Sequence, residues 1–96
     1  MQCSIYKKMG DRMNSKQRAT LAQIFETPTR KDIPWSDVES LLRALGGTTR
    51  GIGGSRVDVR IGTVRAVFHR PHPQPTTPAR RVKAVRAFLE QAGVRP

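Results

Sequence analysis

The stretch of residues 53–74, GGSRVDVRIGTVRAVFHRPHPQ, decides the fold of this chain and also contains both of its histidines. Apolar and polar residues alternate on each side of Gly62-Thr63, which is the pattern of two β-strands joined by a tight turn. Glycine as the first of two central residues favours a type II′ turn, whose backbone needs a positive φ there. The stretch therefore predicts a β-hairpin centred on Gly62-Thr63.

The position of this turn fixes how the two strands pair. The predicted pairs are Ile61 with Val64, Arg60 with Arg65, Val59 with Ala66, Asp58 with Val67, Val57 with Phe68, and Arg56 with His69. One face of the hairpin is apolar, and we expect it to pack on helices. The other face carries three arginines, an aspartate and a histidine.

Two helices are predicted before the hairpin. The first covers residues 14–26 with an asparagine or serine cap, and the second begins at the capping box of residues 36–39 and ends at Gly46-Gly47. A connector with two prolines, residues 27–35, separates them. We expect Trp35 to pack in the core rather than stack on a base.

The remaining elements complete an α+β pattern. Residues 48–50 predict a short first strand and residues 51–54 a glycine-rich turn, a cluster that a phosphate cradle would also use. After the hairpin, prolines exclude regular structure up to Thr77, which is expected to cap a last helix that starts at Pro78 and runs to about Ala92. The order α, α, β, β, β, α predicts a two-layer sandwich, with helices on one face of a three-stranded antiparallel sheet.

The charge of the chain points to an anionic partner. The 96 residues include 18 Lys and Arg against 7 Asp and Glu, a formal net charge of +11. Residues 48–96 alone carry 10 basic and 2 acidic side chains, so the excess follows the hairpin. Nucleic acid is the leading candidate, and the alternatives are an acidic protein partner or a charge that only keeps the protein soluble.

Composition also excludes several classes. Cys3 is the single cysteine, so an internal disulfide is excluded and no Cys/His metal site or cofactor is expected. No apolar run approaches a membrane span or a signal peptide, so a cytoplasmic protein without membrane contact is expected. Residues 1–13 are interpreted as a flexible tail, and residues 14–96 as a single domain. A DNA-binding or interaction domain ranks last, because helix-turn-helix and heptad patterns are absent.

Four features occur in a telling order: a helix ending in Leu45-Gly46, a Gly54-Ser55 step before the second strand, a cluster of prolines and histidines after the third strand, and the ending FLEQAGV of residues 88–94. Together they resemble the HicA family of toxins from bacterial toxin-antitoxin modules over residues 35–94. The resemblance implies a fold like the double-stranded RNA-binding domain, α-β-β-β-α, here with an extra N-terminal helix. It also implies an mRNA interferase, an endoribonuclease that arrests translation and is neutralised by a HicB antitoxin bound over its active face.

One position departs from the family pattern. The family has a histidine regarded as catalytic directly after the Gly-Ser step, and here that residue is Arg56. A guanidinium keeps its proton in proteins, so Arg56 cannot act as a general base. Two hypotheses follow. Either His69, paired with Arg56 across the hairpin, supplies the imidazole, or the chain is a catalytically silent RNA-binding module of the same fold.

In the first hypothesis the chemistry needs no metal. His69 takes the proton of the RNA 2′-hydroxyl, Arg56 stabilises the charge that develops on phosphorus, and His72 protonates the leaving 5′ oxygen. Asp58 either orients His69 or pairs with Arg65. A histidine at a strand end is also common as a plain surface residue.

The RNA-binding surface is expected around the paired Arg60 and Arg65. Like charges opposite each other destabilise a sheet by a few tenths of a kcal/mol, which suggests that a polyanion lies between them. The further RNA-binding candidates are Ser55, Arg70 and Lys83. Because the phenylalanines are assigned to the core, base stacking is disfavoured. The expected partners are mRNA and a HicB-type antitoxin, with a monomeric toxin outside that complex.

Overall fold

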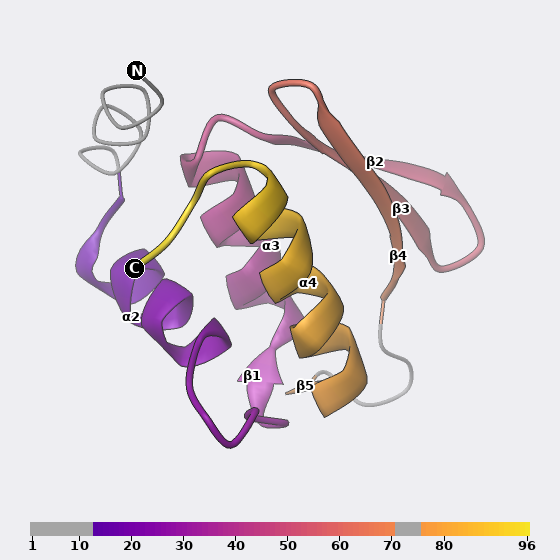
Figure 1. Ribbon diagram of the computed structural model, residues 1–96. Helices are drawn as coiled ribbons and strands as arrows, with labels where there is room; N and C mark the ends of the chain where they lie inside the picture. Colours follow the sequence, from indigo (N-terminus) through magenta and orange to yellow (C-terminus); the bar gives the residue numbers. More distant parts are fainter. Residues whose placement is uncertain (1–12, 71–75) are drawn as a thin grey trace.

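The structure of the chain is a computed structural model that describes residues 13–70 and 76–96 (Figure 1). The predicted tail up to residue 12 and the candidate acid His72 therefore lie outside the described residues. Met13, which the sequence analysis assigned to the tail, is 7% exposed and belongs to the hydrophobic core. Met13, which precedes the N-cap of the first helix, therefore packs with the domain and not with the predicted tail.

The main sheet of the described chain is antiparallel and three-stranded, with helices on one side of it (Figure 1). The sheet has the strand order β2-β3-β4, with β2 at Thr48–Gly53, β3 at Arg56–Ile61 and β4 at Val64–His69. The helices are α2 at Ser15–Ile24, α3 at Trp35–Ala44 and α4 at Ala79–Gln91. Helix α3 lies against β2 and α4 against β4, while α2 packs on both helices. The predicted α+β fold with a three-stranded antiparallel sheet is confirmed.

The hairpin has the predicted register at every pair from Ile61 with Val64 to Arg56 with His69. A type II′ turn requires a positive φ at its first central residue and a negative φ at its second. Gly62 has a φ of 60°, and Thr63, like every described non-glycine residue, has a negative φ, so the predicted turn is consistent with the structure. The first strand is longer than predicted, because β2 continues with a bulge to Gly53 and pairs with β3 along its length. The connection of β2 to β3 is therefore Gly54-Ser55 rather than the whole glycine cluster.

A two-stranded sheet that the sequence analysis missed joins distant parts of the chain. Strand β1, Ile33–Pro34, pairs antiparallel with β5, Thr76–Thr77. The predicted capping role of Thr77 was wrong: Pro78 is the N-cap of α4, and no side chain hydrogen-bonds there. Thr77 is instead paired with Ile33 and completely buried, and among the described residues its hydroxyl has no hydrogen-bond partner.

The predicted capping box of residues 36–39 was also wrong. Helix α3 begins at Trp35 with Pro34 as its N-cap, so Ser36 already lies inside the first turn. The indole Nε1 of Trp35 donates a hydrogen bond to Glu39 Oε2 at 2.7 Å, which removes Glu39 from the capping role. At α2 the predicted cap is confirmed at Asn14. Its side chain accepts from the amide of Gln17, and the Gln17 side chain accepts from the amide of Asn14, a capping box that the sequence analysis did not predict.

The core lies between the sheet and the helices. Val57 and Val59 from β3 are fully buried, as are Leu41 and Leu42 from α3. Trp35 is 6% exposed, and its ring centroid lies 6.1 Å from that of Phe68, which in turn contacts the ring of Phe88 at 5.9 Å. The core assignment of Trp35 is confirmed, so it is not a platform for a base.

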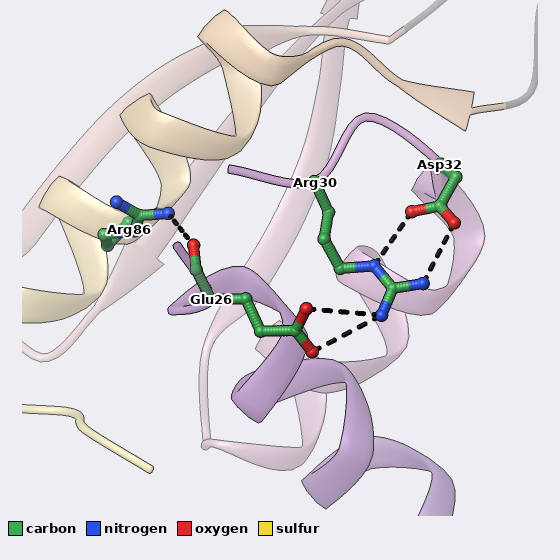
Figure 2. A network of polar contacts seen from close by, with 4 residues as sticks. All are labelled: Glu26, Arg30, Asp32 and Arg86. Atoms are coloured by element: carbon green, nitrogen blue, oxygen red, sulfur yellow. Dashed lines mark hydrogen bonds and ion pairs between the residues drawn. The ribbon is translucent and has the colours of Figure 1, made fainter. Parts of the chain in front are cut away.

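A polar network fixes the segment between α2 and β1 to the last helix (Figure 2). Arg30 Nε and Nη2 each lie 2.9 Å from an oxygen of Asp32, and Arg30 Nη1 donates to Glu26. Arg86 of α4 donates from Nη2 to the carbonyl oxygen of Glu26 at 3.0 Å and from Nε to that of Ile24 at 2.9 Å. Arg86 therefore holds α4 against the end of α2.

Candidate nucleic-acid interface

The strand pairing places a set of charged side chains on the face of the sheet that points away from the helices. We call this set the outer face. Its members are Thr48, Arg50, Arg56, Asp58, Arg60, Arg65, Val67 and His69. All of them are exposed except Asp58, and four are arginines, so the outer face is strongly positive.

Asp58 is the centre of this face. Its carboxylate accepts a hydrogen bond from Arg65 Nε at 2.8 Å and lies 3.5 Å from Arg60 Nε. The hydrogen bond from Arg65 holds the pKa of Asp58 below its usual range, and the positive charge of Arg60 adds to the effect. The carboxylate is therefore ionised at neutral pH and neutralises part of the charge above it.

The ion pairs of Asp58 change the interpretation of the two opposed arginines. Arg60 and Arg65 are direct cross-strand partners, as predicted. Both also lie against Asp58, so the protein itself offsets their mutual repulsion. The opposed arginines alone are then no sign of a polyanion, and the case for one rests on the whole outer face. Of the two roles considered for Asp58, the structure shows the pairing with Arg65.

His69 and Arg56 are direct partners at the open end of the hairpin. Directly paired residues have Cβ atoms about 4.5–5.5 Å apart. The Arg56 guanidinium extends toward β2, where its Nη2 would lie 3.6 Å from a Cβ atom placed on Gly53. Both side chains are exposed. The hydrogen bonds made by the described residues include none to the ring of His69, and the carboxylate of Asp58 is occupied by arginine.

Ser55 and Arg70 border this corner. The amide of Arg70 donates to the carbonyl oxygen of Ser55 at 2.7 Å, which extends the pairing of β3 and β4 one step beyond His69. The Arg70 side chain turns to the helical layer, where its Nε donates to Glu39 Oε2 at 2.9 Å. Sequence reasoning missed Glu39 as a partner, since it lies 31 residues from Arg70 and no local pattern links the two.

Lys83 is apart from the other predicted RNA-binding residues. It is exposed on α4, in the layer of helices that covers the opposite side of the sheet (Figure 1). The structure thus brings Arg56, Arg60, Arg65 and His69 together and places Lys83 elsewhere. Arg70 and Ser55 lie at the edge of the group.

Within residues 13–70 and 76–96, no three His, Cys, Asp or Glu side chains are arranged to hold a metal ion. No helix in these ranges combines the length and the apolar character that crossing a membrane needs.

Comparison with known proteins identifies one family. The model of the HicA toxin of bacterial toxin-antitoxin systems matches residues 35–94, which run from the start of α3 to the residues after α4. The matched segment contains the whole outer face, and α2 lies before it. No curated protein and no solved structure matches the chain.

Proposed function

We propose that this chain, which belongs to the HicA family of toxins of bacterial toxin-antitoxin systems, is an RNA-binding toxin that cuts messenger RNA. The family membership makes it the toxin of such a system. RNA as the target, cleavage as the activity and inhibition by a HicB-type antitoxin are the further parts of the proposal.

The observation that carries the proposal is the outer face itself. Four arginines lie on one side of a three-stranded sheet, and the chain as a whole has a net charge of +11. Contacts between arginine and phosphate give affinity for RNA without reading its sequence. His69 lies at the end of the same face, and imidazole is the side chain that most often serves as a general base.

The cleavage step uses these side chains in a balanced transfer. His69 accepts the proton of the 2′-hydroxyl while the 2′ oxygen attacks phosphorus, and the bond from phosphorus to the 5′ oxygen breaks. The products are a 2′,3′-cyclic phosphate and a 5′-hydroxyl, whose proton comes from water or from His72. Arg56 stabilises the negative charge on the phosphoryl oxygens. No metal ion takes part in this scheme.

A silent RNA-binding toxin is the second candidate, and one observation favours it. The family's histidine position is occupied by Arg56, and the carboxylate closest in the pattern, Asp58, is bound to Arg65 and therefore does not orient His69. An imidazole without an orienting partner is a weaker base catalyst.

The antitoxin is proposed to act by occlusion. A HicB-type protein with an acidic surface would cover the outer face and neutralise its arginines, which would block access of RNA to His69. A complex that leaves Arg60, Arg65 and His69 open to solvent would contradict this.

The test separates enzyme from binder. The purified protein is incubated with a mixed transcript with and without EDTA, together with the variants His69→Ala and Arg56→His. His69→Ala should abolish EDTA-resistant cleavage and keep RNA affinity and melting temperature, because the side chain is exposed. Cleavage by His69→Ala at the wild-type rate would remove His69 from the mechanism. An inactive wild type that gains cleavage through Arg56→His would establish the silent candidate.

A further inference from the structure

We propose that Asp58 is a positioning residue for RNA, which holds Arg60 and Arg65 as a paired clamp for one phosphate group. The inference rests on the proposed RNA binding of the outer face and adds the geometry with which that face would take the backbone.

The first support for the clamp is that Arg60 and Arg65 contact Asp58 through Nε and not through their terminal nitrogens. Arg65 and Arg60 both turn the Nε side of the guanidinium to Asp58, at 2.8 Å and 3.5 Å. Among the described residues, the terminal nitrogens of these two arginines make no hydrogen bond. A guanidinium has five N–H donors in a rigid fork that matches a phosphate. Each arginine thus keeps its outer donors for an acceptor outside the protein.

The layering of charge supports the same conclusion. The Asp58 side chain is 7% exposed, whereas those of Arg60 and Arg65 are 55% and 57% exposed. The carboxylate lies beneath and the guanidinium groups above, so an approaching phosphate meets positive charge first. Arg50, the partner of Asp58 on β2, adds a further exposed cation beside them.

Holding the arginines in advance has an energetic benefit for binding. An arginine that must be immobilised when RNA arrives lowers affinity by roughly 2- to 10-fold through lost side-chain freedom. If Asp58 has already ordered both arginines, RNA binding avoids most of that loss. The net charge alone predicts the opposite effect on affinity, because removing a carboxylate from a surface that binds a polyanion should tighten binding.

The experiment uses this difference in sign. Binding of a 2′-O-methylated RNA of mixed sequence, which lacks the nucleophile for cleavage, is measured at several salt concentrations for Asp58→Asn. The control is Asp32→Asn, which removes the same charge from an aspartate that is also paired with an arginine (Figure 2). Asp32 directly precedes β1, which is not a strand of the main sheet, and so it is not part of the outer face. We expect Asp58→Asn to bind about 3- to 10-fold more weakly with an unchanged salt slope, and Asp32→Asn to match the wild type or bind slightly more tightly.

Equal or tighter binding by Asp58→Asn would overturn the proposal, and so would an equal loss in Asp32→Asn. If Asp58→Asn fails to fold, Arg65→Lys decides, because lysine keeps the charge and loses the fork. Weaker binding by Arg65→Lys supports the clamp, and wild-type binding overturns it. If the outer face did not bind RNA at all, the result would be distinguishable, because Arg60→Ala and Arg65→Ala would then both bind RNA as tightly as the wild type.

Discussion

Gly47 occupies a position where the structure leaves no room for a side chain. It lies between the end of α3 and the start of β2, and its amide donates to the carbonyl oxygen of Leu42 at 2.9 Å. A Cβ atom there would lie 2.7 Å from that oxygen, 2.9 Å from the carbonyl oxygen of Arg60 and 2.9 Å from Ile61 Cγ1. Two of the three obstacles are backbone atoms, so Gly47→Ala must shift either α3 or β3.

The expected cost can be estimated from two opposing effects. Forcing an extra methyl group into a packed site costs about 1–3 kcal/mol. Replacing glycine with alanine also restricts the unfolded chain, which returns about 0.4–1 kcal/mol. The net destabilisation is then on the order of 1–2 kcal/mol. In a domain of this size 1 kcal/mol corresponds to about 4–8 °C, so the melting temperature should fall by roughly 4–16 °C.

The assay is thermal unfolding followed by circular dichroism, with Gly51→Ala as the matched control. Gly51 lies in β2, the strand that begins one residue after Gly47, and a Cβ atom there would have only Arg70 Nη1 within 4 Å, at 4.0 Å. We expect Gly51→Ala to melt within a few degrees of the wild type. Equal melting temperatures for the two variants would refute the argument from close approach.

Three further outcomes are expected. Arg86→Met should destabilise the protein by about 1–3 kcal/mol in urea unfolding, because it leaves the carbonyl oxygens of Ile24 and Glu26 without their donor; the exposed Lys83→Met should change stability by less than about 0.5 kcal/mol. Phe68→Ala should cost about 3–5 kcal/mol, since it removes a ring that contacts two others in the core, and a loss below 1 kcal/mol would contradict this packing. The pKa of Asp58 is lowered in the folded state, so its stabilising effect is complete above the unfolded pKa of about 3.9 and disappears as pH falls through the folded pKa. The urea concentration at the unfolding midpoint should therefore decrease as the pH is lowered below about 4, and this decrease should be less steep in Asp58→Asn. An equally steep decrease in that variant would show that the ion pairs of Asp58 do not contribute to the pH dependence of folding.

The sequence by itself determined the hairpin and its register. Alternation of apolar and polar residues with period two is local, and a two-residue turn beginning with Gly62 allows only one pairing of the strands. The buried stripes of α3 and α4 follow equally from helical spacing, since a helix must bury its apolar face. The partnership of His69 and Arg56 is therefore a property of the sequence, as is the large positive charge.

Tertiary structure alone decided which polar groups meet. Asp58 falls at an outward position of its strand, yet two arginines cover it and bury it. Glu39 has the spacing of a capping box, but its carboxylate accepts hydrogen bonds from Trp35 and Arg70 instead. Arg86 reaches backbone oxygens about sixty residues away along the chain. Such contacts depend on how complete layers pack, and no local period in the sequence records them.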